Sequence, residues 1–317
     1  MAAPRPHLPG DVGPAPGPTR AAVPGDPGPV RRGGRVSGAG LEVLSAGPLT
    51  TVQDLGRPGH APWGVGRSGA ADRRSLRLAN RLVGNAVEAA GLEVLLGGLE
   101  LRPDRDVVIA LTGARCAATI GGRAADHNTV LRVPAGSVLR LGTASAGLRT
   151  YVAVRGGIDV PPVLGSRSYD VLSGLGPPVL AAGTVLAVGA PPARFPCVDM
   201  APVPDPPAGP VRLRVMSGPH DDWFTGDALG LLERTAWTVT TASDRIGMRL
   251  AGAELARARS TELPSAGVVR GALQVTPAGQ PTLFMSDHPL TGGYPVIAVV
   301  VDVDVDRAAQ VRPGQDL

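Results

Sequence analysis

The hydrophobic residues of this chain gather in short runs that glycine and proline separate. In the first half of the chain these runs are close together, which is typical of an antiparallel β-sandwich or β-barrel. The predicted strands cover residues 41–44, 92–96, 107–112, 116–120, 129–133, 138–141, 150–154 and 184–188. The pattern therefore predicts a first domain made mainly of β-strands.

One segment between these strands has the spacing of a helix. Leu76, Ala79 and Val83 recur every three or four residues, Asp72 is a candidate N-cap, and Gly84 is placed to end the helix. A single helix among so many strands argues against repeated βαβ crossovers.

The last third of the chain repeats this style. Strands are predicted at residues 211–216, 237–241, 247–250, 273–276, 282–285 and 295–301, and a short helix at 227–234. Residues 277–280 are expected to form a hairpin turn, because Gly279 can adopt a positive φ. The pattern predicts two β-barrel-like domains of similar composition.

Proline and glycine mark the expected boundaries. The 317 residues include 33 Pro and 44 Gly but only nine aromatic side chains. Residues 1–38 hold few bulky apolar side chains, so we expect a disordered N-terminal extension. A second proline-rich stretch, 191–210, is the expected linker between a first domain at 39–190 and a second at 211–317.

Charge narrows the range of functions. All 31 basic residues are arginine, which excludes a P-loop lysine, a Schiff base and a Ser-Lys nucleophile pair. Residues 1–38 hold five Arg and two Asp, a net of +3, so only +1 of the total +4 belongs to residues 39–317. A nearly neutral globular part argues against a nucleic-acid-binding surface.

Apolar runs and cysteines point to a cytoplasmic protein. No run approaches the roughly 20 apolar residues of a membrane helix, and no secretory signal opens the chain. The two cysteines, Cys116 and Cys197, and the five histidines lack metal-ligand spacing, so we expect reduced thiols and no metal site.

Residues 64–69 match the pattern G-x-G-x-x-G and lead into the predicted helix. A nucleotide phosphate at the helix N-terminus is conceivable, but a loop instead of a strand precedes the motif. A mobile ligand-binding loop and a simple turn remain as interpretations.

Gln53, Asp54 and Arg57 place an amide, a carboxylate and a guanidinium within five residues. Such a loop can bind a small polar ligand. Equally, these side chains can pin their own loop, with Arg57 paired to Asp54 at the surface.

Two further groups in the second half are candidates for ligand binding. His220 and Asp221 follow a predicted strand and can form an acid/base pair or a capped surface turn. Gly292, Gly293 and Tyr294 precede a hydrophobic strand, with Gln280 upstream. The two glycines expose backbone N–H groups to an anion, or simply form a tight entry to the strand.

These segments together resemble the KipA-type family, which is also known as the family of the second allophanate hydrolase subunit. Matching residues run in the family's order over nearly the whole folded part. They include Thr51-Val52-Gln53-Asp54, Gly56-Arg57, Gly69-Ala70, Asp72, Ala79-Asn80, Leu92-Glu93, Leu111 to Ala114, Tyr151 to Pro161, Gly165 to Ser168, Gly218 to Trp223, Arg245 to Leu250, Gln280-Pro281 and Thr291 to Pro295.

The resemblance implies two cyclophilin-like β-barrels in one component of an ATP-dependent 5-oxoprolinase complex. The implied partners are the KipI-type B component and the A component of that complex. It implies ATP, with Mg²⁺, as co-substrate, and no single catalytic residue is assigned. Two alternatives are a urea carboxylase-like carboxyltransferase half, using carboxybiotin on a carrier protein, and a non-catalytic regulator that binds a KipI-type kinase inhibitor.

The chain also departs from the family pattern. Ala266 and Arg270 stand where relatives often have Glu and Pro, Asp244 replaces a frequent Asn, and Tyr169 replaces a frequent Thr. Relatives continue into a final strand where this sequence stops at Leu317. The absence of that strand would leave an open sheet edge in the second barrel.

Overall fold

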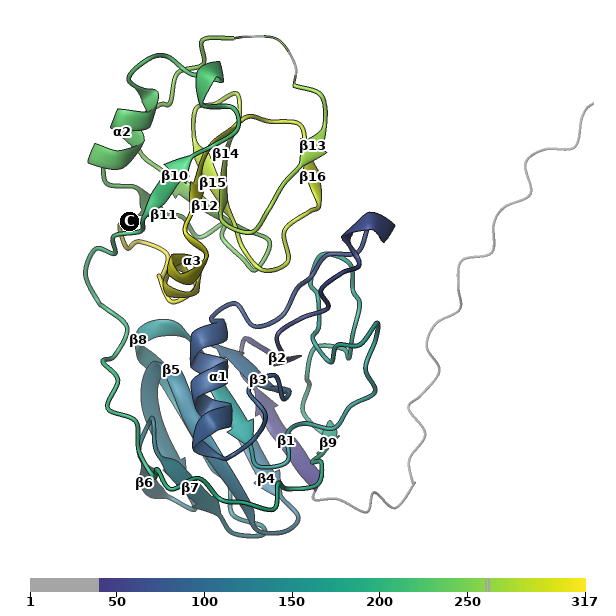
Figure 1. Ribbon diagram of the computed structural model, residues 1–317. Coiled ribbons are helices and arrows are strands. Elements are labelled where there is room, and N and C mark those ends of the chain that lie inside the picture. Colours follow the sequence, from purple (N-terminus) through teal and green to yellow (C-terminus); the bar gives the residue numbers. More distant parts are fainter. Residues whose placement is uncertain (1–39, 260, 262) are drawn as a thin grey trace, which may run out of the picture. The chain divides into compact units, whose positions relative to one another are not determined.

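The computed structural model describes residues 40–259, 261 and 263–317, which belong to one compact unit. The predicted N-terminal extension, residues 1–38, lies outside the described residues. Strands dominate both halves of the described part, so the prediction of a mainly β protein is confirmed (Figure 1).

The first half forms a nine-stranded antiparallel sheet. Its main path runs β2-β3-β8-β4-β1-β9, and the long strand β5 pairs with β8, β6 and β7. The strands are β1 (Gly40–Ala46), β2 (Leu49–Gln53), β3 (Gly91–Leu95), β4 (Leu99–Pro103), β5 (Val107–Ile120), β6 (Arg123–Ala125), β7 (Val130–Val133), β8 (Leu139–Val154) and β9 (Val185–Ala187). Because β5 and β8 are long and their register shifts at bulges, the sheet can curl around its core.

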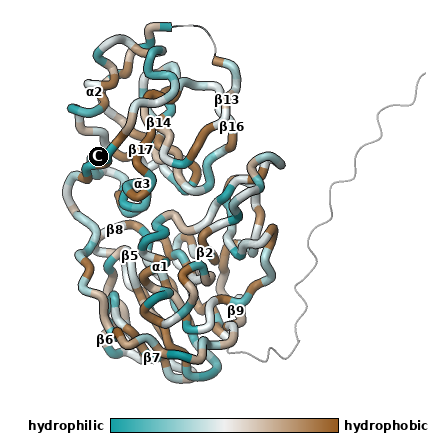
Figure 2. Tube along the Cα trace, in the orientation of Figure 1, coloured by the Kyte–Doolittle hydropathy of each residue, from teal (hydrophilic) through white to brown (hydrophobic). Residues whose placement is uncertain are grey.

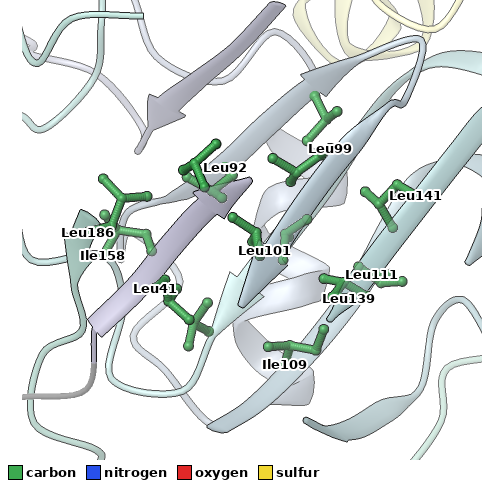
Figure 3. Close-up of a cluster of buried hydrophobic side chains, with 14 of the residues drawn as sticks. Leu41, Leu92, Leu99, Leu101, Ile109, Leu111, Leu139, Leu141, Ile158 and Leu186 are labelled. Carbon is green, nitrogen blue, oxygen red and sulfur yellow. The ribbon is translucent and has the colours of Figure 1, made fainter. Parts of the chain in front are cut away.

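Large aliphatic side chains from these strands pack into one core. Leu92, Leu99 and Leu111 are completely buried, and the neighbouring Leu41 and Leu139 are nearly so (Figure 3). Burying one such side chain contributes about 1.5–3 kcal/mol. Figure 2 shows hydrophobic residues concentrated along the strands, as the short apolar runs predicted.

The predicted helix of the first half is α1 (Arg73–Leu82). The Asp72 carboxylate caps it by accepting a hydrogen bond from the Ser75 N–H at 3.0 Å, and Gly84 follows its end with φ 73°. Leu76, Ala79 and Leu82 are buried on the face toward β5 and β8. The N-cap, the apolar face and the end of this helix all agree with the prediction.

The second half has its own sheet and core. Six strands follow the order β10-β17-β14-β15-β12-β11, and β13 pairs with β16 separately. The strands are β10 (Val215–Ser217), β11 (Thr238–Val239), β12 (Gly247–Ala251), β13 (Ala266–Gly267), β14 (Ala272–Val275), β15 (Pro281–Phe284), β16 (Thr291–Gly292) and β17 (Val296–Val300). Helix α2 (Ala228–Arg234) and the Gly279 turn, with φ 71°, confirm two further predictions.

Helix α3 (Asp302–Ala308) is an element that the hydrophobic pattern did not predict. Residues 301–306 alternate valine with aspartate, which is the period of a strand. Two aspartates in the first turn favour a helix through its dipole. Asp304 and Asp306 are also buried against arginines from distant segments, so tertiary contacts decide the structure here.

The proline-rich stretch 191–210 contains no helix or strand. It connects the two sheets, and the domain limits stay a prediction. The short 3-10 turns η1 (Ala61–Trp63) and η2 (Asp221–Trp223) complete the described elements. None of the helices in the described part is both long and apolar enough to span a membrane.

Candidate functional site

A buried group of charged residues joins the two halves. Arg245, from the second half, donates to Glu93 Oε1 at 2.5 Å and makes two hydrogen bonds to Asp287, at 2.8 and 3.0 Å. Tyr151 on β8 donates its hydroxyl to Glu93 Oε2 at 2.7 Å, and Arg149 Nε lies 3.4 Å from Glu93 Oε1. All five side chains are at least 95% buried. We call these residues the central cluster.

The glycine-rich loop at residues 64–69 contributes to this cluster through its polar groups. Ser68, with φ 54°, donates its hydroxyl to Asp287 at 2.6 Å, and the Gly69 carbonyl accepts from Arg245 at 2.6 Å. The loop follows the turn η1 instead of a strand, and the Asp72 carboxylate already caps the helix after it. The motif therefore serves a contact between the halves and not a dinucleotide-binding fold.

Glycine is required at residue 69 for a steric reason. Its φ is 97°, and a Cβ there would lie 2.7 Å from the Gly56 nitrogen. Such a separation is far below a normal van der Waals contact, so a side chain would push the two loop segments apart. The close approach of these segments brings the Gly69 carbonyl to Arg245.

The cluster holds its groups in defined charge states. Burial alone would raise the pKa of Glu93, but Arg245 and Arg149 outweigh it and lower that pKa below its ordinary value. Burial lowers the pKa of Arg245, whereas Asp287 and Glu93 raise it to a net value above the ordinary one. Burial, reinforced by Glu93, raises the pKa of Tyr151, so its phenol stays a hydrogen-bond donor.

A cavity of about 280 Å³ opens beside the central cluster. Its volume is near the lower end of small-molecule sites. Apolar side chains form most of its wall, and its polar lining residues are Thr51, Glu93, Arg149, Thr241, Ser243, Asp244 and Arg245. Arg149 donates through Nη1 to the Ala309 carbonyl at 2.5 Å, while its Nη2 has no hydrogen-bond partner among the described residues. We call this cavity the inter-half cleft.

The first group of predicted site residues pins a loop. Asp54 is 8% exposed and accepts hydrogen bonds from the hydroxyls of Ser166, at 2.6 Å, and Ser168, at 2.5 Å. Gln53 donates to the Tyr169 carbonyl at 2.8 Å, and the fully buried Arg57 donates to the Ser168 carbonyl. The expected surface pair between Arg57 and Asp54 is not formed.

Two buried polar atoms of this group lack partners within the described part of the chain, namely Gln53 Oε1 and Arg57 Nη1. Because an unpaired buried polar atom is costly, it is a candidate for contact with a bound molecule or water. A binding role for Gln53, Asp54 and Arg57 stays a prediction.

The second group of predicted residues gathers around β16 and β17. His220 Nδ1 accepts a hydrogen bond from the Val296 N–H at 3.2 Å, which places it beside the segment of Gly292, Gly293 and Tyr294. Tyr294 is 44% exposed, and the centroid of its ring lies 5.7 Å from Arg257 Cζ. A Cβ on Gly292 would meet Gln274 Nε2 at 2.5 Å, so a side chain there would displace the end of the Gln274 side chain.

Two predicted residues lie apart from that group in their contacts. Asp221 is exposed in η2, and Gln280 ties the β14–β15 turn to another loop by accepting from the Gly252 N–H at 2.9 Å. No hydrogen bond or ion pair among the described residues joins the Gln53 group to the His220 group. Their roles in binding remain untested predictions.

The central cluster escaped sequence reasoning as a site. Glu93, Tyr151 and Arg245 belong to the segments that carry the family resemblance, and neither Arg149 nor Asp287 is among the predicted ligand-binding residues. One local signal existed, because Glu93 stands between apolar residues of a buried strand. A charge in such a place needs a buried partner, but the sequence does not say which one.

The two cysteines and possible metal ligands are the remaining candidates for chemistry. Cys116 is buried with its sulfur 3.5 Å from His127 Nε2, and Cys197 is exposed. Burial raises the pKa of the Cys116 thiol and lowers the pKa of His127, so both groups stay neutral. Within the described ranges, no group of three or more His, Cys, Asp or Glu side chains is placed to hold a metal ion.

Comparison with known proteins defines the class. The family model for the carboxyltransferase domain, subdomains A and B, matches residues 63–317, so the chain belongs to this family. The chain is homologous to the C component of 5-oxoprolinase. It is 38% identical to that component of the Escherichia coli enzyme over 87% of this chain and 89% of that protein.

Larger proteins contain a similar region. The chain is 33% identical to the urea amidolyase of Lachancea kluyveri over 87% of its own length but 16% of that protein. The crystal structure of TTHA0988 superposes with a TM-score of 0.80 at 35% identity, covering 88% of this chain and 55% of that one. This chain therefore spans about half the length of TTHA0988.

Proposed function

We propose that this chain is the C component of an ATP-dependent 5-oxoprolinase, which opens 5-oxo-L-proline to L-glutamate together with the A and B components. The observation that carries the proposal is the 38% identity to the C component of a 5-oxoprolinase over nearly the full length of that protein. Because that relative is one component of an enzyme, partner chains are implied. A KipI-type B component and a cytoplasmic location belong to the same proposal.

The proposed reaction has two steps. With the B component, the chain promotes transfer of the γ-phosphoryl group of ATP, held with Mg²⁺, to the lactam oxygen, and ADP leaves. Water then attacks the activated carbon at the A component, the ring C–N bond breaks and the nitrogen takes up a proton, which leaves an acyl phosphate. A second water hydrolyses this acyl phosphate to the carboxylate, and phosphate leaves. Phosphorylation turns a poor leaving oxygen into a good one, which explains the demand for ATP.

The inter-half cleft is the place we propose for the lactam. Its volume of about 280 Å³ and apolar wall suit a five-membered ring. The substrate carboxylate would face Arg149 Nη2, because a guanidinium binds a carboxylate by charge-assisted hydrogen bonds. The central cluster would hold Arg149 in place through Glu93, 3.4 Å away.

The test reconstitutes the complex. The A and B components with this chain should release glutamate from 5-oxoproline only when ATP is present, and omission of this chain should abolish release. Thr241 is exposed at the cleft, so Thr241→Trp should block substrate and reduce turnover about tenfold or more while the chain stays folded.

A neighbouring residue supplies the matched control. Ala242 is also exposed but does not line the cleft, so Ala242→Trp should retain turnover. Equal turnover in both variants would show that the substrate does not bind in the cleft. If the three soluble components with ATP release no glutamate, the proposed function itself is wrong.

The second candidate function is carboxyl transfer from carboxybiotin on a carrier protein to urea or a related amide. It is favoured by the family model, which describes a carboxyltransferase domain, and by the match to urea amidolyase. This function predicts consumption of carboxybiotin without ATP in the transfer step. A regulator of a kinase inhibitor would instead bind a KipI-type partner and turn over neither substrate.

A further inference from the structure

A row of arginines occupies the outer face of helix α1. Arg74, Arg77 and Arg81 lie at intervals of three and four residues, so they share one face of the helix. Arg307 of α3 and Arg214 line the same groove, whose volume is about 550 Å³. We call this the arginine groove.

The acidic residues of the groove are already paired. Asp304 accepts two side-chain hydrogen bonds from Arg214, at 2.8 and 2.9 Å, and its pKa falls to about 2 because of this contact. Asp306 is paired with Arg73 at 3.2 Å and with Arg270 at 2.7 Å. These carboxylates are therefore engaged by arginines other than those on the outer face of α1.

The α1 arginines have no such partners. Among the described residues, Arg74, Arg77 and Arg81 make no side-chain hydrogen bond and no ion pair. Arg307 has a single, long contact of 3.7 Å to Asp304. Four guanidinium groups of one groove thus have most of their donors available, and their mutual repulsion disfavours the empty site.

A second cavity of about 450 Å³ continues the groove and shares Arg74, Arg81, Asp306 and Arg307 with it. Part of its wall is apolar, from Leu78, Val203, Pro204, Pro206 and Val211. Asn128 also lines it, and its buried Oδ1 lacks a hydrogen-bond partner within the described part. A molecule with an anionic end and a less polar end would match both cavities.

We propose that the arginine groove binds a polyphosphate group. The helix rise places Arg74 and Arg77 about 4.5 Å apart along the axis, and Arg74 and Arg81 about 10.5 Å apart. Successive phosphoryl groups of a triphosphate can therefore contact successive guanidiniums, each by forked hydrogen bonds. In a chain without lysine, such a row replaces a P-loop lysine.

The source of the triphosphate is a separate matter. That it belongs to a nucleotide rests on the proposed function, in which ATP is the phosphoryl donor. The adjoining cavity would then accept the nucleoside, with the orphan Asn128 Oδ1 accepting from a base amino group. The anion site itself rests on the groove alone.

The experiment titrates the purified chain by calorimetry at low salt with Mg²⁺ present. The probes are inorganic tripolyphosphate, ATP and adenosine. Tripolyphosphate and ATP should bind, and Arg74→Gln with Arg81→Gln should weaken both about tenfold or more, because two charge-assisted contacts are lost. If tripolyphosphate does not bind, the proposal is overturned.

The control changes the same charge elsewhere. Arg123 and Arg132 are exposed on β6 and β7 and line neither cavity, so Arg123→Gln with Arg132→Gln should leave both affinities within about twofold. Equal weakening in the two double variants would show a general charge effect and would overturn the site.

Two comparisons separate this inference from the proposed function. ATP that binds more tightly than tripolyphosphate supports a nucleotide site, whereas equal binding supports an anion site that ignores the nucleoside. If the complex releases glutamate but the groove variant binds ATP as tightly as the parent chain, only the proposal for the groove is refuted. Groove-dependent binding in a complex that never releases glutamate refutes the proposed function only.

Discussion

Arginine has different roles in two regions of this protein. In the central cluster, Arg245 is 2% exposed and bonds to Glu93, Asp287 and the Gly69 carbonyl. In the arginine groove, Arg74 and Arg81 are exposed and have no ion-pair partner among the described residues. In the central cluster the positive charge is neutralised by buried carboxylates, whereas in the arginine groove it stays available to a ligand.

The comparison shows how a lysine-free chain divides its positive charge. A guanidinium is planar and weakly hydrated, so it can be buried when carboxylates surround it. The same group binds phosphate in a forked geometry when it is exposed. Exposure and the presence of acidic partners, and not residue type, separate a structural arginine from a binding one.

The largest expected effect on stability comes from disrupting the central cluster. Arg245→Met leaves Glu93 and Asp287 as buried carboxylates that have lost their main partner. Such a loss costs about 3–5 kcal/mol of unfolding free energy. Urea denaturation of the variant and the parent chain measures it, and a change below about 1 kcal/mol would show that the cluster does not stabilise the contact between the halves.

A second test changes the other side of the same cluster. Glu93→Gln should lower the unfolding free energy at pH 7 by about 1.5–3 kcal/mol, the range for hydrogen bonds to charged groups. The carboxyl has a folded pKa below its ordinary value of 4.5, owing to Arg245 and Arg149 acting against burial. Its contribution is therefore present above pH 4.5 and is lost as the pH falls through the folded pKa.

The pH dependence gives this test its signature. Unfolding free energies of both proteins should converge as the pH drops below 4.5, because the parent chain loses a contribution that the variant never had. A constant difference between the two curves at all pH values would assign the effect to packing instead of charge.

Local features of the fold were predictable, and long-range ones were not. Asp72 and Gly84 sit next to the helix that they delimit, so the sequence shows α1 directly. Helix α3 alternates valine and aspartate like a strand, and its buried aspartates find Arg73 and Arg214 far away in the chain. Short-range pattern cannot report such partners.

The same limit applies to the candidate site. Gln53, Asp54 and Arg57 are clustered in sequence, but their contacts reach residues 163–169, more than 100 positions away. The central cluster joins Glu93 to Arg245 across 152 positions. Sequence reasoning located polar loops but not the buried cluster between the halves.

A smaller effect on stability is expected from an exposed ion pair, which is paired like the central cluster but exposed like the arginine groove. Arg102 contacts Glu42 at 2.6 Å, with side chains that are 46% and 39% exposed. Arg102→Ala should lower the unfolding free energy by less than about 1 kcal/mol, because water competes for both charges. A loss comparable with that of Arg245→Met would mean that burial does not control the value of these pairs.

The smallest expected effect lies in the arginine groove. Because Arg74 and Arg81 have no ion pair to lose among the described residues, Arg74→Gln with Arg81→Gln should change the unfolding free energy by no more than about 0.5 kcal/mol. Relief of repulsion among the groove arginines can even stabilise the variant slightly at low salt, and added salt should remove that gain. Urea denaturation at two salt concentrations measures both. A loss above about 1 kcal/mol would show that these arginines have structural partners, and it would erase the distinction between the groove and the central cluster.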